Sequence, residues 1–174
     1  MRFRAVVAAI ALMASGMSSA SATMLISADR GGQIGHYLHT FALIRSSGER
    51  VVIDGYCLSA CTLVLGLVPR ERVCVTQRAR LGFHAAWMPD AEGRPITSAM
   101  GTQALMNIYP RSVRRWIYRQ GGLSPRMIFL EGRELARIVQ SCDSRAWRYG
   151  TQSGTRYSRS PVRDYGASAS GYRR

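Results

Sequence analysis

The sequence predicts an α/β domain with a mostly parallel sheet flanked by helices. Short apolar runs that suit buried strands alternate along the chain with segments in which apolar residues recur at helical spacing. This strand–helix–strand rhythm is typical of parallel sheets, whose strands need crossover connections. The length of 174 residues suits one such domain, and sites in this class gather at the carboxyl ends of strands.

Residues 1–22 are predicted to be a secretory signal peptide. Two arginines form its basic start, residues 5–13 are apolar and uncharged, and Ala20 and Ala22 place small residues where signal peptidase reads the chain. Cleavage before Thr23 would export the protein to the periplasm or the medium. The alternative is an uncleaved membrane anchor, but a span needs about 20 apolar residues and serines interrupt this run.

The first half of the remaining chain predicts four strands and two helices. Tyr37, Phe41 and Ile44 share one face of a helix that ends at Gly48. A second helix, rich in small apolar residues, is closed by Pro69. The expected strands are 24–27, 51–53, 72–75 and 79–84, and the expected helices are 36–44 and 59–68.

The second half predicts mainly helices and then a basic tail. The polar stretch 89–95 is expected to be a loop, and Ser124 followed by Pro125 predicts a helix start. The domain is expected to span 23–142. Residues 143–174 are rich in Arg, Ser, Gly and Tyr, and they offer too little apolar surface to offset chain entropy, which predicts a disordered tail. The other expected helices are 98–109, 111–120 and 132–139.

The net charge of +14 comes from arginine alone, because the chain contains no lysine. Loss of the two signal-peptide arginines would lower it to +12. Such a chain is attracted to anionic surfaces. We expect the tail at 143–174 to be solvated and without a specific partner, with contact to an anionic envelope surface as the alternative, and we expect no specific nucleic acid. The arginine-rich stretch 111–119 is expected to be a solvated helix face, with an anionic partner as its alternative.

Four cysteines predict disulfides, because an even number in an exported chain favours pairing over metal binding. No two of them have the two-residue spacing of a zinc site, and no histidine lies near them at ligand spacing. We therefore expect no metal and no cofactor. Three pairings are open, and we favour Cys57 with Cys61 and Cys74 with Cys142.

Ser59 and His84 are the candidates for chemistry. Ser59 follows a strand and a glycine turn at Gly55 and opens a helix, where helix N–H groups favour negative charge. His84 ends a later strand, 25 residues on, and a parallel strand–helix–strand unit would bring the two together as nucleophile and general base. The turn at Gly31 and Gly32 could aim backbone N–H groups at an oxyanion. The simpler interpretation of Ser59 is a helix N-cap.

These motifs, in this order, resemble the proteolytic subunit of Clp protease and the wider ClpP/crotonase fold over residues 24–140. Asp29–Gly32 stands where that family has a Ser-Pro-Gly-Gly turn. Gly55–Ser59 matches its Gly-x-Ala-x-Ser nucleophile turn, with Cys57 at the alanine position. Gly82–His84 matches its strand-end histidine. The chain also resembles exported ClpP-like proteins of Gram-negative bacteria that share a Cys-x-Ser-Ala-Cys pattern.

The resemblance implies a serine hydrolase that acts on a peptide or acyl substrate. Ser59 would be the nucleophile and His84 the general base. The backbone N–H groups of Gly32, Gln33 and Ala60 would form the oxyanion hole. It also implies a reduced ClpP-like domain that lacks the first strand–helix unit, and the open sheet edge left behind predicts self-association as a homo-oligomer or a partner.

The chain departs from the family at the third residue of the family's catalytic triad of serine, histidine and aspartate. Alignment puts Met127 where the family has an aspartate, and a methionine cannot orient a histidine. Asp29, Asp90 and Glu131 are the candidate replacements. Some relatives with this fold use a catalytic Ser–Lys dyad, and the absence of lysine excludes that arrangement here. The alternative function is therefore a catalytically inactive binding or structural protein of the cell envelope, and a third is an envelope adaptor that acts through the tail.

Overall fold

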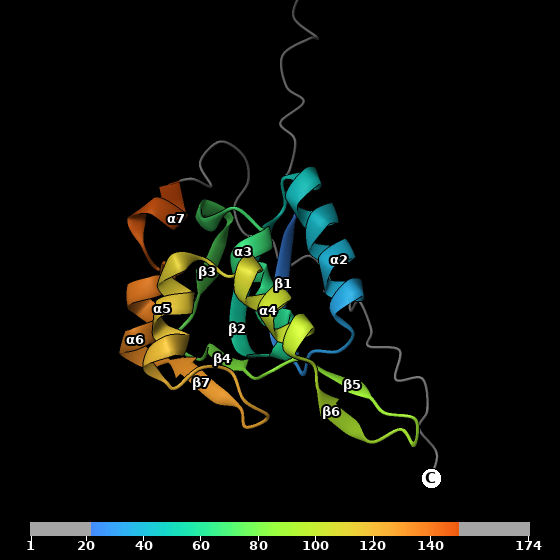
Figure 1. The fold of residues 1–174 in the computed structure, drawn as a ribbon. Coiled ribbons are helices and arrows are strands. Elements are labelled where there is room, and N and C mark those ends of the chain that lie inside the picture. The colour runs from blue at the N-terminus through green and yellow to red at the C-terminus, as the bar shows by residue number, and fades with distance from the viewer. Residues whose placement is uncertain (1–21, 150–174) are drawn as a thin grey trace, which may run out of the picture.

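The computed structural model describes residues 22–149 and shows a mixed α/β fold built on a five-stranded sheet (Figure 1). The strand order is β1-β2-β4-β7, and β3 also pairs with β2. The first four strands are parallel and β7 is antiparallel, which confirms the mostly parallel sheet that the sequence predicts. The strands are β1 (Thr23–Asp29), β2 (Arg50–Leu58), β3 (Val73–Val75), β4 (Arg80–Phe83) and β7 (Ile128–Glu131).

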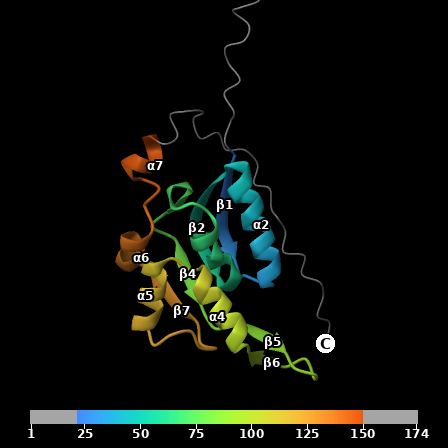
Figure 2. The same ribbon diagram turned by 45° about the horizontal axis from the view of Figure 1, so that its top comes forward.

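Helices flank the sheet on two sides. Figures 1 and 2 place α2 on the side of β1, and α5 and α6 on the side of β7. A 3₁₀ turn, η2, follows β2 directly and runs into the short helix α3. The helical elements are α2 (Ile34–Ser47), η2 (Ser59–Leu63), α3 (Val64–Leu67), η3 (Arg70–Arg72), α4 (Ala99–Ile108), α5 (Arg111–Arg119), α6 (Gly132–Ile138) and α7 (Arg145–Tyr149). Within residues 22–149, no helix has the length and apolar character needed to span a membrane.

Strand β2 is longer than the sequence predicts because it changes partners along its length. Its first part pairs with β3 and its last residues pair with β4, so the strand continues to Leu58 and the turn expected at Gly55 is wrong. The pairing of β1 with β2 shifts register between Ile26 and Ala28. At this bulge Gly55 is needed, since a Cβ there would lie 2.0 Å from the carbonyl oxygen of Ser27.

Two features of the second half differ from the prediction. The expected loop is the tip of a hairpin formed by β5 (Trp87–Pro89) and β6 (Pro95–Thr97). The helix expected at Ser124 is wrong: residues 124–127 are not helical, and strand β7 follows them. The local cap-then-proline signal is overridden by tertiary pairing, because β7 runs along β4 and buries Leu130 completely.

The described fold extends beyond the predicted end of the domain at residue 142. Helix α7 places Trp147 against Arg50, whose guanidinium carbon lies 3.4 Å from the centre of the indole ring. Arg50 Nη2 also donates to the Trp147 carbonyl at 3.0 Å. Burial lowers the pKa of Arg50, and its Nη1 atom has no hydrogen-bond partner among the described residues. The predicted signal peptide at 1–22, apart from Ala22, and the rest of the tail lie outside the described residues.

The core of the domain lies between the sheet and the helices around it. Phe83 of β4 packs edge to face on Tyr109, with 5.3 Å between ring centres, and tilted on Trp116 of α5 at 5.5 Å. Both Phe83 and Trp116 are fully buried. Rings that bury this much apolar area fix the relative positions of β4 and α5. They therefore hold the carboxyl end of β4, where His84 begins the next segment.

Candidate active site

Ser59 and His84 meet at the carboxyl ends of two neighbouring parallel strands. Ser59 is the first residue after β2, and His84 is the first after β4. The register pairs Leu58 with Gly82, which brings the two strand ends together. Ser59 Oγ lies 2.8 Å from His84 Nε2, a hydrogen-bond distance. Both residues are half-buried, so a substrate can reach the pair.

The backbone of Ser59 is held in an unusual conformation. Its φ angle is 54°, and it is the only residue other than glycine with a positive φ among residues 22–149. A left-handed conformation costs an L-residue about 1–2 kcal/mol, so surrounding contacts must hold it in place. One such contact is the Thr62 hydroxyl, which donates to the Ser59 carbonyl at 2.6 Å. Thr62 Oγ1 is itself 2.7 Å from the hydroxyl of Tyr109, and burial raises the pKa of Tyr109 to about 12.

A disulfide spans the turn that carries Ser59. Cys57 and Cys61 are bonded to each other, with 5.3 Å between their Cα atoms, and both are fully buried. The second disulfide joins Cys74 of β3 to Cys142. Both pairs are the ones favoured from the sequence. The first bond closes a loop with Ser59 at its centre, and it restricts the backbone where the conformation is least favourable.

The glycine turn after β1 packs directly on Ser59. Gly31 has a φ of 79°, and a Cβ at this position would lie 2.6 Å from the Ser59 Cβ and 2.5 Å from the Leu58 carbonyl oxygen. Only glycine allows this approach. Asp29 holds the turn, because its Oδ1 accepts from Gly31 N at 2.7 Å and from the Tyr37 hydroxyl at 2.5 Å. Burial, and then the bond to Asp29, raise the pKa of Tyr37.

The three residues predicted to supply an oxyanion hole lie on two elements beside Ser59. Gly32 and Gln33 continue the Gly31 turn, and Gln33 is the N-cap of α2. Their backbone N–H groups donate to no partner within the described part of the chain. Ala60 stands in the first turn of η2, where N–H groups have no partner inside the helix. All three positions can therefore offer a backbone donor.

Met127 occupies the place opposite His84. The β4–β7 ladder ends with Phe83 opposite Ile128, so the next antiparallel pair would be His84 and Met127. The side chain of Met127 packs over Gly82: its sulfur lies 2.5 Å from the position of a Cβ built on that glycine. Position 127 thus carries a thioether, packed over a residue two before His84, where the resemblance would place a carboxylate.

The three candidate acids have partners other than His84. Asp29 binds the Gly31 turn, and Glu131 Oε2 lies 3.3 Å from Arg80 Nε. Asp90 belongs to the tip of the β5–β6 hairpin. Within residues 22–149, none of the three hydrogen-bonds to His84.

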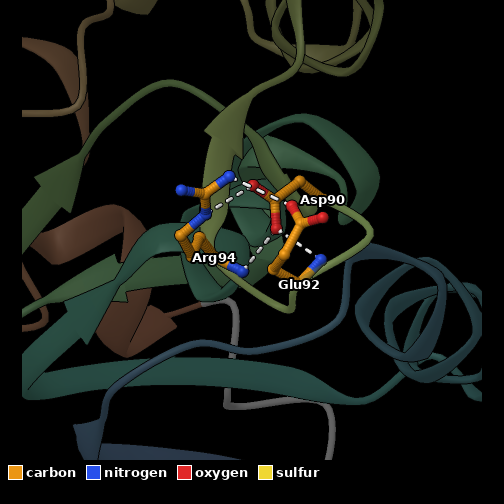
Figure 3. A network of polar contacts seen from close by, with 3 residues as sticks. All are labelled: Asp90, Glu92 and Arg94. Atoms are coloured by element: carbon orange, nitrogen blue, oxygen red, sulfur yellow. Dashed lines mark hydrogen bonds and ion pairs between the residues drawn. The ribbon is translucent and has the colours of Figure 1, made fainter.

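Asp90 is committed to the hairpin, as Figure 3 shows. Its carboxylate accepts from the backbone N–H of Arg94 at 2.8 Å, from Arg94 Nε at 2.8 Å and from the Glu92 N–H at 3.0 Å. The bond from the Arg94 backbone, followed by the Arg94 side chain, lowers the pKa of Asp90. Asp90 is a turn-forming residue in this structure, and it does not orient the histidine.

Sequence reasoning missed the residues that support the pair. Thr62 lies three residues after Ser59, and this spacing on a 3₁₀ turn could have pointed to its contact. Tyr109 is 47 residues from Thr62, and no local pattern links them. His36 and His39, whose spacing suits a metal, are both exposed on α2. No group of three His, Cys, Asp or Glu side chains converges within the described residues.

No protein-family model matches the chain, and no curated protein matches its sequence. Among solved structures, one titled "Crystal structure of an Enzyme" is 6% identical and has a TM-score of 0.43, covering 77% of this chain and 83% of that one. A ClpP1 mutant from Listeria monocytogenes is 14% identical with a TM-score of 0.33, covering 68% of this chain and 89% of that chain.

Proposed function

We propose that this protein is a serine hydrolase, with a peptide or acyl substrate, that acts outside the cytoplasm. The observation that carries the proposal is the 2.8 Å contact between Ser59 Oγ and His84 Nε2. A serine within hydrogen-bond reach of an imidazole is the minimum arrangement for an activated serine nucleophile. The two disulfides support an oxidising compartment, in agreement with the predicted signal peptide.

Ser59 and His84 act in both halves of the proposed reaction, the acylation of the serine and the release of the acyl group. His84 Nε2 takes the proton from Ser59 Oγ while the oxygen bonds to the substrate carbonyl carbon, and the carbonyl electrons move onto its oxygen. The backbone N–H groups of Gly32, Gln33 and Ala60 would bind this oxyanion. The protonated imidazole then gives its proton to the leaving group as the acyl bond breaks. In the second half, His84 takes a proton from water as the water oxygen bonds to the acyl carbon, and the imidazolium then gives that proton to Ser59 Oγ as the bond between Oγ and the acyl carbon breaks.

Within residues 22–149 no carboxylate hydrogen-bonds to His84, and this predicts a slow enzyme. In the best-studied triad, loss of the orienting acid lowers kcat by about 10⁴-fold, because the imidazole is no longer held in the productive tautomer. Here Met127 offers neither charge nor a hydrogen-bond acceptor of comparable strength. We therefore expect hydrolysis well below the rate of a full triad.

The sequence motifs support membership of an exported ClpP-like group. The glycine turn, the nucleophile turn and the strand-end histidine follow in the family order, and in the fold they stand at the ends of β1, β2 and β4. These are three strands of one parallel sheet, which is what a shared site requires.

A second candidate is a binding or structural protein of the cell envelope that keeps the fold without the chemistry. Met127 favours it, since this residue stands where a working triad would need an acid. The buried disulfide on both sides of Ser59 favours it as well, because a rigid turn leaves the serine little freedom to follow a reacting substrate.

Labelling with a fluorophosphonate separates the two candidates. We expect the wild-type protein to be labelled on Ser59, and labelling to disappear in Ser59→Ala and to fall steeply in His84→Ala. Ser46→Ala, at an exposed serine of α2, is the matched control and should label normally. Absence of labelling in a wild-type protein with both disulfides formed would overturn the hydrolase and leave the binding protein.

A further inference from the structure

Helix α5 carries an exposed cationic face that the proposed hydrolase does not use. Val113, Trp116 and Ile117 are buried and attach the helix to the core. The opposite side lines a shallow surface depression, and Tyr118 there is 68% exposed. We call this surface the α5 arginine face; it consists of Arg111, Arg114, Arg115, Tyr118 and Arg119.

The side chains of these arginines form almost no polar contacts with the rest of the described fold. Among residues 22–149, the side chains of Arg111, Arg115 and Arg119 form no ion pair and no hydrogen bond. Arg114 makes one long bond, from Nη1 to the Met106 carbonyl at 3.4 Å. The nearby acid Glu134 is used differently, because it accepts from the indole N–H of Trp116 at 3.1 Å.

The arrangement of charge works against the helix. Arg111, Arg115 and Arg119 follow one another at intervals of four residues, where like charges repel. The first turn of α5 contains no acid. The positive charge of Arg111 is therefore repelled by the positive end of the helix dipole, and no acidic side chain in this turn offsets the repulsion. A face that lowers helix stability and makes almost no internal contact is best explained by a partner of negative charge.

The shape of the face favours an extended partner over a small anion. Its arginines spread over about 12 Å along the helix axis, given the rise of 1.5 Å per residue. The depression is shallow, so a free phosphate there would stay largely in water. A planar array of phosphates can meet all the guanidinium groups at once.

We propose that the α5 arginine face docks on a bilayer rich in anionic phospholipid. Juxtamembrane basic residues are attracted to such surfaces, and the exposed ring of Tyr118 suits the headgroup layer, where its apolar body and polar tip are both satisfied. A single-strand nucleic acid is less suited, because such sites stack successive bases on several aromatic rings and this face offers one. The inference does not depend on the proposed hydrolase.

Vesicle co-sedimentation tests the proposal, with protein recovered after export. We expect binding to vesicles of mixed phosphatidylglycerol and phosphatidylcholine, weakening as salt rises, and no binding to phosphatidylcholine alone. Each surface arginine contributes about fivefold to affinity, so Arg111→Gln, Arg115→Gln and Arg119→Gln together should weaken binding about 100-fold. The unfolding midpoint of this variant should be at least that of the wild type, because the substitutions remove repulsion between like charges.

The tail supplies a matched control with the same change of charge. Arg156→Gln, Arg159→Gln and Arg163→Gln together should weaken vesicle binding far less than the α5 variant. Equal losses in the two variants would overturn the proposal, since net charge alone would then explain binding. Equal binding of the wild type to neutral and anionic vesicles would overturn it too, as would tighter binding to DNA than to anionic vesicles at the same salt.

Discussion

At the scale of single residues, the candidate site depends on the neighbours that hold the Ser59 backbone as much as on Ser59 itself. Ser59 keeps a positive φ because Gly31 lets the β1 turn approach it and because Thr62 holds its carbonyl. These neighbours are small or short, and each fits only because of its size. Substitutions that add one methyl group therefore give sharp tests.

Gly31→Ala should destabilise the fold and abolish labelling of Ser59. The new methyl group would meet Ser59 Cβ at 2.6 Å, and alanine disfavours a φ of 79°, so the free energy of unfolding should fall. We expect a loss of about 2 kcal/mol or more in urea unfolding. Gly32→Ala is the matched control, since its nearest neighbour would be Tyr37 Cε2 at 3.7 Å and it should unfold like the wild type. Equal stability of the two variants would contradict this account of the turn.

Met127→Asp should accelerate labelling of Ser59 by at least about tenfold, part of the effect of an orienting acid in a full triad. The carboxylate would lie just beyond the last pair of the β4–β7 ladder, over Gly82, and from there we expect it to accept a hydrogen bond from the His84 imidazole. The rate constant with a fluorophosphonate is the measurement. Met127→Asn is the control of similar shape without charge and should give a much smaller gain. If a folded Met127→Asp protein reacted no faster, the missing acid would not be what limits the site.

At the scale of elements, the two disulfides have different tasks. Cys57–Cys61 closes a turn of a few residues, whereas Cys74–Cys142 joins segments 68 residues apart. Because loop entropy grows with loop length, removal of the long bond should cost about 4 kcal/mol and removal of the short one about 2 kcal/mol. The labelling rate of Ser59 should follow the opposite order: removal of the short bond should lower it more than removal of the long one, since only the short bond encloses Ser59.

Two double variants test this division. Cys57→Ala with Cys61→Ala should keep more stability in urea but lose most of the labelling rate. Cys74→Ala with Cys142→Ala should unfold more easily and, at temperatures where it stays folded, label close to the wild-type rate. Parallel losses of stability and reactivity in both variants would mean that the short bond has no special role in placing the serine.

At the scale of the whole molecule, the sequence was informative at the carboxyl ends of strands. Gly31, Ser59 and His84 stand just after the ends of β1, β2 and β4, and the parallel topology was enough to expect them at one edge of the sheet. Strand β7 was missed because its four residues are defined by pairing with β4, which no local pattern reports. Helix α7 was missed for a similar reason: its buried ring at Trp147 lies in a polar stretch of sequence.

Stability of the whole fold should fall in acid through Asp54, which joins β2 to the turn before β4. Its Oδ1 accepts from Thr76 Oγ1 at 2.5 Å and from Arg78 Nε at 3.0 Å. The bond from Arg78 lowers the pKa of Asp54 below its ordinary 3.8, so the stabilisation is present above pH 3.8 and is lost as the pH falls through the folded-state value. Urea unfolding at several pH values should show a smaller loss in acid for Asp54→Asn. An identical acid slope in the variant would contradict this role.

The Cys74–Cys142 bond also makes a closed covalent ring of the chain between these residues. The β5–β6 hairpin, the α5 arginine face and His84 all lie on this ring, whereas Ser59 lies on the open segment before it. One cut by a protease in the exposed hairpin tip would therefore release no fragment until the bond is reduced. At the proposed location outside the cytoplasm, the protein would lose the continuity of its chain at the hairpin and still keep Ser59 and His84 in one molecule.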